Sequence, residues 1–215
     1  MYSLSSRITD QEVQHTSRGS LFQPLRNFLA EADSPKPSDV IFVLAGLPER
    51  KVYGLQLFRE GLAPRLILSV GRFEVRRIGG LGFNDLNLRD QAARLPPEQR
   101  HFFIDIVAHS RRVTVRGEAG GGTYAELLSL GRYLESEGTS SLLVVSTSIH
   151  LGRVRYYCRR IALFSGTEMR YVSVPEHLSS FQRAGWWKRC DHWSYVLREC
   201  AKLGLFLLRP PRDTR

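Results

Sequence analysis

The sequence predicts an α/β fold, a Rossmann-like three-layer sandwich around a mostly parallel central sheet. Three short apolar runs, at residues 40–45, 66–70 and 142–145, have the length and composition of strands buried on both faces. A helical pattern follows the first run, and another follows the third. Strands that alternate with helices in this way are typical of parallel sheets covered by helices on both sides.

The first strand leads into a helix and then into the second strand, which closes at Gly71. The helical pattern places Val52, Leu55 and Phe58 on one apolar face, with Leu57 beside it. Gly61 stands where a left-handed C-terminal cap would end the helix. Residues 40–71 are therefore expected to form one strand–helix–strand unit.

A second helix is predicted after the three consecutive glycines at 120–122. Thr123 and Glu126 have the spacing of a capping box, in which each side chain accepts a hydrogen bond from a free backbone N–H. Gly138 is expected to end this helix. Its inward residues, at helical spacing, would be Tyr124, Leu127, Leu128, Gly131 and Leu134.

The third strand is followed at once by Ser146, Thr147 and Ser148, which we expect to cap another helix. The inward face of that helix would consist of Leu151, Val154, Cys158 and Ile161. Weaker patterns predict a glycine loop at 79–82, a short helix at 86–95 and strands at 102–107, 112–115 and 170–174.

The chain divides into an N-terminal tail at 1–37, a Rossmann-like domain at 38–180 and a Trp-rich C-terminal segment at 181–215. The C-terminal segment carries Trp186, Trp187 and Trp193 and an amphipathic helical pattern at 195–208. We favour packing of this helix on the sheet, with the tryptophans filling the seam. The alternative is a peripheral anchor on an anionic membrane surface, which the positive charge would assist.

The formal net charge is +10, and only four of the 31 basic residues are lysines. Arginine forms bidentate contacts with phosphate and carboxylate groups, so this composition favours an anionic partner. The simpler interpretation is a solvated basic surface, because the charge is spread along the chain. No recognised motif interleaves the arginines with aromatic residues, so no specific nucleic acid is expected.

No apolar run approaches the roughly 20 residues that span a bilayer. The first twenty residues also lack the apolar core of a signal peptide. We therefore expect a cytoplasmic protein, with peripheral contact at the inner membrane face as the open alternative. The three cysteines are expected to be reduced, and Cys190, His192 and Cys200 match no compact zinc pattern, so no metal site is predicted.

Open parallel sheets bind ligands beyond the carboxyl ends of their strands. This rule selects the segments at 46–51, 69–72, 120–123 and 146–153. The predicted ligand-binding residues are Gly46, Arg50, Ser69, Gly71, Arg72, Gly122, Thr123, Glu126, Ser146, Thr147, Ser148 and Arg153. His150, at a strand-to-helix turn, is the candidate acid, base or positioning group.

Several signatures of common enzymes are missing. There is no P-loop, the glycines at 79–82 do not extend to the dinucleotide fingerprint, and there is no Gly-x-Ser-x-Gly elbow. These absences disfavour an NAD enzyme, a P-loop ATPase and an α/β-hydrolase. They leave a small-molecule site whose arginines and helix starts would hold an anion.

Four stretches, at 39–46, 60–71, 122–126 and 143–153, resemble the YdcF-like family, also called the ElyC/SanA/YdcF family. The last is the most specific, because the family's strand ends in Thr-Ser and continues into a His-Leu-x-Arg helix start. The chain departs from the family at three points. It has Ala45 before Gly46 where the family has Gly-Gly, Val70 in place of a glycine, and Gly122 to Glu126 without the family's two asparagines.

The resemblance implies a Rossmann-like sheet and a role in bacterial cell-envelope biogenesis, including peptidoglycan precursors or their lipid carrier. It also implies S-adenosylmethionine as a candidate ligand. We expect a protein that binds a small anionic ligand, phosphate-bearing or nucleotide-like. Whether it acts on that ligand as a transferase or hydrolase, or is a non-enzymatic binding protein docked on anionic membrane, stays open at this point.

Overall fold

The structure is a computed structural model that describes residues 32–76, 81, 87–94, 96, 101–107, 110–114, 122–181 and 188–208. Most of the predicted N-terminal tail, the glycine loop at 79–80 and residue 82, and Trp186 and Trp187 lie outside the described residues. The boundaries predicted for the three parts of the chain stay predictions.

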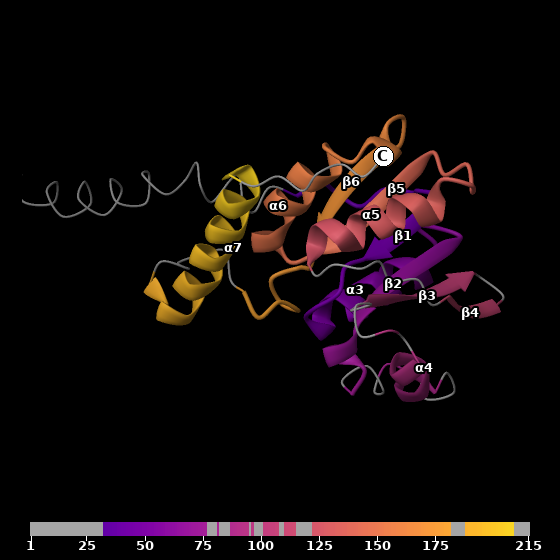
Figure 1. The fold of residues 1–215 in the computed structure, drawn as a ribbon, viewed down its shortest axis with the longest axis horizontal. Coiled ribbons are helices and arrows are strands. Elements are labelled where there is room, and N and C mark those ends of the chain that lie inside the picture. Colours follow the sequence, from indigo (N-terminus) through magenta and orange to yellow (C-terminus); the bar gives the residue numbers. More distant parts are fainter. Residues whose placement is uncertain are drawn as a thin grey trace, which may run out of the picture.

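The described strands form one six-stranded sheet in the order β4-β3-β2-β1-β5-β6 (Figure 1). Their bounds are β1 Val40–Val43, β2 Arg65–Gly71, β3 His101–Val107, β4 Ser110–Thr114, β5 Ser141–Ser146 and β6 Glu168–Ser173. The central strand β1 pairs in parallel with β2 and β5, and β5 pairs in parallel with β6. The antiparallel pairs of this sheet are those of β3 with β2 and with β4. The predicted mostly parallel α/β fold is confirmed.

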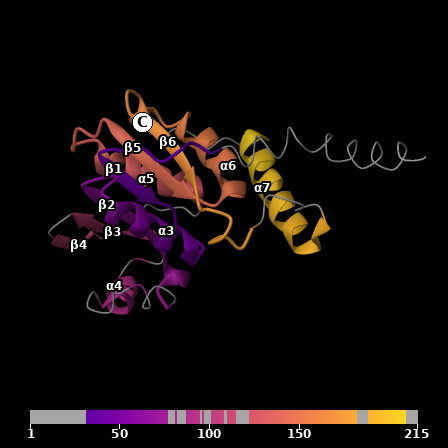
Figure 2. The ribbon, with the colours of Figure 1, turned by 180° about the vertical axis from the view of Figure 1, so that it is seen from behind.

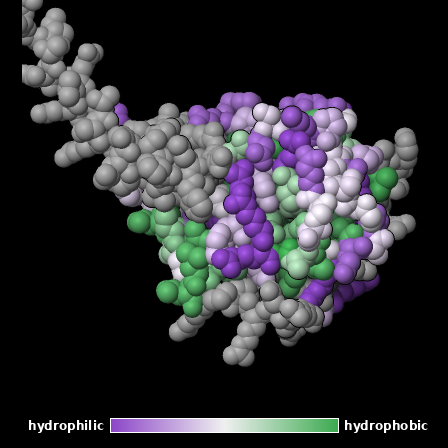
Figure 3. All heavy atoms as spheres, turned by 90° about the horizontal axis from the view of Figure 1, so that it is seen from above, coloured by the Kyte–Doolittle hydropathy of each residue, from purple (hydrophilic) through white to green (hydrophobic). Residues whose placement is uncertain are grey.

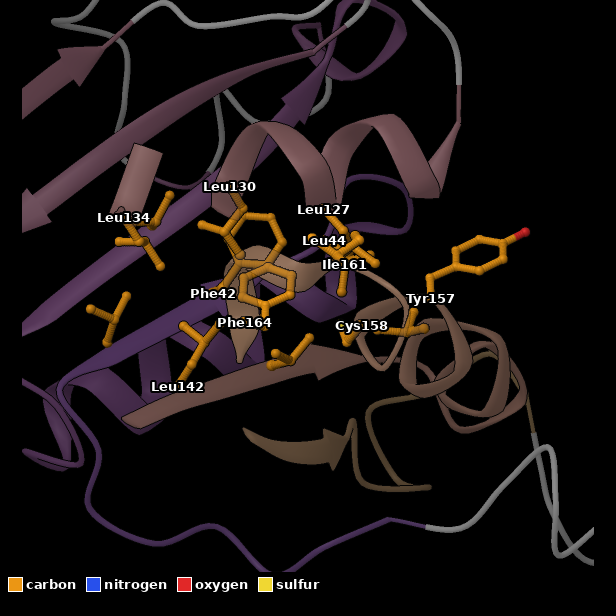
Figure 4. Packing of buried hydrophobic residues seen from close by; sticks show 14 of the residues in the cluster. Phe42, Leu44, Leu127, Leu130, Leu134, Leu142, Tyr157, Cys158, Ile161 and Phe164 are labelled. Atoms are coloured by element: carbon orange, nitrogen blue, oxygen red, sulfur yellow. The ribbon is translucent and has the colours of Figure 1, made fainter. Parts of the chain in front are cut away.

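Helices cover both faces of the sheet (Figures 1 and 2). Their bounds are α3 Pro48–Arg59, α4 Leu88–Arg94, α5 Thr123–Leu134, α6 Ser148–Cys158 and α7 Cys190–Leu208, with short 3-10 turns η1 Arg72–Glu74 and η4 Ala162–Phe164. Because successive strand residues point to opposite faces, β1 contributes to two cores. Ile41 and Val43 pack with Tyr53 and Leu57 of α3. Phe42 packs on the other face with side chains of α5 and α6 (Figure 4).

The apolar face predicted for α3 is confirmed in part. Leu57 is 2% exposed, and Leu55 and Phe58 are partly buried and pack against the core, but Val52 is 41% exposed. The buried side of α3 also includes Arg50 and Gly54. A Cβ atom at Gly54 would clash with Val43 Cγ2, so this glycine lets the helix approach β1 closely.

Gly61 directly follows the C-cap of α3 with a φ angle of +78°, in the left-handed region that glycine favours, and ends this helix as predicted. Gly138 also has a positive φ angle, +63°, but α5 ends before it, at Leu134 with Glu135 as its C-cap. The caps predicted at the helix starts are absent. Neither α5 nor α6 has a side-chain hydrogen bond from its N-cap residue among the described residues, and the N-cap of α5 is Gly122, not Thr123.

The C-terminal helix α7 packs beside α6 rather than on the sheet (Figures 1 and 2). Val196 joins a small core with Ile149 and Phe181, and the Phe206 ring lies 4.3 Å from the Tyr157 ring between centroids. Four leucines of α7 stay exposed: Leu197, Leu205, Leu207 and Leu208. Apolar side chains gather at the end of the molecule where α7 lies (Figure 3). None of the described helices combines the length and apolar character needed to cross a membrane.

Two helix glycines differ in the space around them, so we expect their substitution by alanine to change the free energy of unfolding in opposite directions. Gly54→Ala should lower the free energy of unfolding by about 1–3 kcal/mol, because the added methyl group overpacks the core against Val43. Gly204→Ala in α7, where an added Cβ meets nothing within 4 Å, should raise it by up to about 1 kcal/mol through helix propensity. Urea denaturation of both variants measures these changes, and equal effects of the same sign would contradict the packing described.

Candidate functional site

A cavity of about 540 Å³ opens beyond the carboxyl ends of β1 and β2. The starts of α3, α5 and α6 surround it, and α7 adds one wall. Its lining consists of Ala45, Gly46, Arg50, Arg72, Phe73, His101, Gly122, Thr123, Glu126, His150, Arg153, Glu199 and Lys202. This volume is within the usual range for a small-molecule site.

Most of the predicted site residues meet in this cavity. Gly46, Arg50, Arg72, Gly122, Thr123, Glu126, His150 and Arg153 all line it. Ser69, Gly71, Ser146, Thr147 and Ser148 do not. Ser69 lies fully buried within β2, and Gly71 donates its N–H to Glu74, so a direct ligand role for these two residues is not supported. Ser146 and Thr147 instead hold the side chains of His150 and Arg50, respectively.

Arg50 brings a buried positive charge to the cavity. Its Nη1 donates to the Ala45 carbonyl at 2.6 Å and its Nη2 donates to Thr147 Oγ1 at 2.9 Å. Its Nε has no hydrogen-bond partner, and the described residues provide no carboxylate within ion-pair distance. Burial lowers the pKa of Arg50, and the more distant charge of Glu126 opposes this. The guanidinium therefore lacks the direct counter-charge that buried cations usually have.

The side chains predicted to cap α5 face the cavity instead. Thr123 is the first helical residue, and its Oγ1 lies 3.2 Å from His150 Nε2. Glu126 Oε1 accepts a hydrogen bond from the Ala45 N–H at 2.7 Å, across the sheet edge. The capping-box prediction is wrong because these long-range partners take both side chains. Neither side chain therefore caps the first turn of α5.

His150 links two hydroxyl groups. Its Nδ1 lies 2.8 Å from Ser146 Oγ, and its Nε2 faces the Thr123 hydroxyl. Burial, and then the positive charges of Arg153 and Arg50, hold the pKa of His150 well below 6.5. The imidazole is therefore neutral near pH 7, with one ring nitrogen donating and the other accepting. The two hydroxyls can complement either tautomer.

The wall from α7 carries two charged residues that the sequence patterns did not indicate, Glu199 and Lys202. Arg153 donates to Glu199 through Nε at 2.7 Å and Nη2 at 3.2 Å, and Lys202 lies 3.3 Å from the same carboxylate. Burial alone would lower the pKa of Arg153, but the hydrogen bonds and charge of Glu199 more than offset this and raise it. Arg153 thus reaches the cavity already paired.

Glu74 holds together the loops that follow β1 and β2. Its Oε1 accepts the N–H of Gly46 at 2.6 Å and the N–H of Gly71 at 3.1 Å, while Oε2 forms an ion pair with the buried Lys51. Sequence reasoning missed this pair, because residues 23 positions apart in a 3-10 turn and a helix show no periodic pattern. The carboxylate ties the loop at Gly46, which lines the cavity, to the end of β2.

The cavity lining carries four basic side chains against two carboxylates. The basic residues are Arg50, Arg72, Arg153 and Lys202, and the acidic residues are Glu126 and Glu199. Among these six side chains the positive charges exceed the negative ones by two, which favours an anionic ligand. The described residues contain no group of three or more His, Cys, Asp and Glu side chains suited to hold a metal ion.

No protein-family model, no curated protein and no solved structure matches this chain. The resemblance to the YdcF-like family therefore stays a prediction. Three of the four stretches that carry the resemblance contribute lining residues to the cavity, among them Gly46, Gly122 and His150. The function is inferred below from the cavity itself.

The buried pair of Lys51 and Glu74 makes a prediction about stability. Lys51→Met should cost about 3–5 kcal/mol, because it leaves the buried Glu74 carboxylate without its counter-charge. Adding Glu74→Gln to this variant should recover part of the lost stability. The neutral amide removes the unpaired charge and keeps an oxygen that accepts the N–H groups of Gly46 and Gly71. Chemical denaturation of the two single variants and the double variant measures the coupling. Strictly additive losses would contradict a direct pair.

The low pKa of His150 predicts a pH dependence of stability. Below pH 6.5 the unfolded chain binds a proton at this histidine that the folded protein does not bind, so the wild type should lose stability as pH falls from 7 to 5. The His150→Gln variant should lose less stability than the wild type over this range, and the two slopes should differ by up to about 1.4 kcal/mol per pH unit. Unfolding free energies of both proteins across this range provide the measurement. Parallel curves would show that His150 titrates normally.

Proposed function

We propose that this chain binds a small phosphate-bearing molecule in the cavity, with Arg50 as the central anion-binding group. One observation carries the proposal: Arg50 is buried in the cavity wall with an unpartnered Nε and no carboxylate partner among the described residues. Charge-assisted hydrogen bonds from a guanidinium to phosphate are stronger than those between neutral groups. A bound phosphate would supply the counter-charge that the protein itself does not.

The helix starts around the cavity support the same ligand class. Amide groups at a helix N-terminus attract anions, and α5 begins beside Arg50 without a side-chain cap. Gly122, which precedes the helix, has a φ angle of +100°, and an added Cβ would meet nothing within 4 Å. The backbone is thus open to close approach by a ligand at this point.

The site also offers groups for acid–base chemistry on the bound molecule. A hydroxyl beside an imidazole is the arrangement that transferases and hydrolases use to activate a nucleophile. Here the depressed pKa makes His150 a weak base, so its main role is to orient the Thr123 hydroxyl toward the ligand. Ser146 holds the opposite ring nitrogen and fixes the ring plane.

The resemblance to the YdcF-like family is the basis for placing this ligand in bacterial cell-envelope or peptidoglycan-precursor metabolism. S-adenosylmethionine is the rival ligand from the same resemblance. It carries a sulfonium and an ammonium group, and the positive lining of the cavity disfavours both. A phosphate ester fits the lining better.

Peripheral docking on anionic membrane is the second candidate function. The exposed leucines of α7, including Leu205 and Leu208, are the observation that favours it. Leu205→Ser combined with Leu208→Ser should then abolish flotation of the protein with anionic vesicles. Unchanged flotation of this variant would exclude docking through α7.

The anion proposal is tested with two arginines of the same helix. Isothermal titration with pyrophosphate should show binding to the wild type, and Arg50→Gln should weaken it at least about tenfold, the usual effect of losing a hydrogen bond to a charged group. Arg59→Gln is the matched control, because Arg59 is an exposed residue of α3 outside the cavity lining. Thermal melts confirm that each variant is folded. Failure of the wild type to bind, or equal binding by Arg50→Gln, would overturn the proposal.

A further inference from the structure

A second compartment of about 240 Å³ adjoins the cavity. Arg50, Phe73 and His150 line both spaces, so the two meet at the buried guanidinium. The new compartment lies between the start of α6 and the part of α7 at residues 195–202, and Ile149 and Tyr195 belong to its wall. No step of the proposed anion binding uses this space.

Phe73 is the most unusual residue of the shared wall. It is 67% exposed, although its neighbours Arg72 and Glu74 are partly or fully buried. Its ring lies against Gly71, where an added Cβ would clash with the ring. Because Gly71 has no side chain, the Phe73 ring has room to lie beside the cavity. A single exposed aromatic residue is ordinary, but this one borders two connected compartments above a buried cation.

Tyr195 presents a second aromatic ring to the same compartment from α7, and it is 42% exposed. Polar groups complete the wall, including the Thr147 hydroxyl and the Arg198 guanidinium. Thr147 Oγ1 accepts from Arg50, so its own O–H proton can be donated into the compartment. Aromatic faces with a few polar groups between them suit a flat ring that carries heteroatoms. A long hydrocarbon chain would instead need a continuous apolar wall.

We propose that the second compartment is the subsite for a heteroaromatic ring of the ligand, such as a nucleobase, stacked on Phe73. This inference rests on the proposed binding of a phosphate at Arg50 and names the class of ligand: a phosphate ester of a ring-bearing alcohol. The phosphate lies at the guanidinium between the compartments. The ring lies on the side of Tyr195, and the remaining phosphate oxygens face Thr123 in the larger cavity.

The experiment compares four probes by isothermal titration: inorganic phosphate, ribose 5-phosphate, adenosine 5′-monophosphate and octyl phosphate. Adenosine 5′-monophosphate should bind about tenfold or more tightly than ribose 5-phosphate, the usual gain from stacking one base on an aromatic residue. Phe73→Ser should remove most of this gain, measured as the ratio of the affinities for adenosine 5′-monophosphate and ribose 5-phosphate in the same variant. Tyr195→Ser is a second, independent variant, in which we also expect the affinity gain of adenosine 5′-monophosphate over ribose 5-phosphate to fall.

Leu197→Ser is the matched control, because Leu197 is 58% exposed on α7 and lines neither compartment. It should bind all four probes as the wild type does. If no probe binds to the wild type, the proposed function fails and this inference fails with it. If the phosphates bind but the base adds nothing, or octyl phosphate gains as much as the nucleotide, the ring subsite is wrong while anion binding at Arg50 stands.

Discussion

The buried charge of Arg50 is the constraint on which the site depends. A charge moved out of water is costly unless a counter-charge and hydrogen bonds replace the lost hydration. Two other buried cations at the sheet edge meet this need directly, Lys51 with Glu74 and Arg153 with Glu199. Arg50 meets it only in part, through a carbonyl, a hydroxyl and carboxylates beyond ion-pair distance. The protein therefore lacks a direct counter-charge at this point, and the proposed anion in the cavity would supply it.

The fold keeps this charge in place by tying the loops at the strand ends to one another. Glu74 accepts the N–H groups of Gly46 and Gly71, and Glu126 accepts the N–H of Ala45. These carboxylates hold backbone from different strands at one edge of the sheet. Since Arg50 hydrogen-bonds the Ala45 carbonyl in the same loop, the loops and the guanidinium are positioned as one unit.

The sequence predicted the sheet correctly, and most of the residues that it selected as a candidate site line one cavity, because both features follow from local patterns. Apolar runs locate parallel strands, and the strand-end rule alone brought Arg50 and His150 to one cavity. The sequence predicted the helix caps poorly. The Thr123 hydroxyl contacts His150, 27 residues away, and no short motif encodes this contact. The wall from α7 was missed for the same reason. Glu199 has no local pattern, and its role appears only when α7 packs beside α6.

The side-chain resonance of the Arg50 Nε–H group tests the central claim most directly. This group is a buried, unpartnered donor of the guanidinium that lines the cavity, and proton–nitrogen correlation spectra can identify its signal by comparison with a protein that lacks Arg50. Titration with inorganic phosphate should move this signal more than that of any exposed arginine and follow a saturating curve. A signal that stays in place while exposed arginines respond would contradict the account, because the anion would then bind elsewhere.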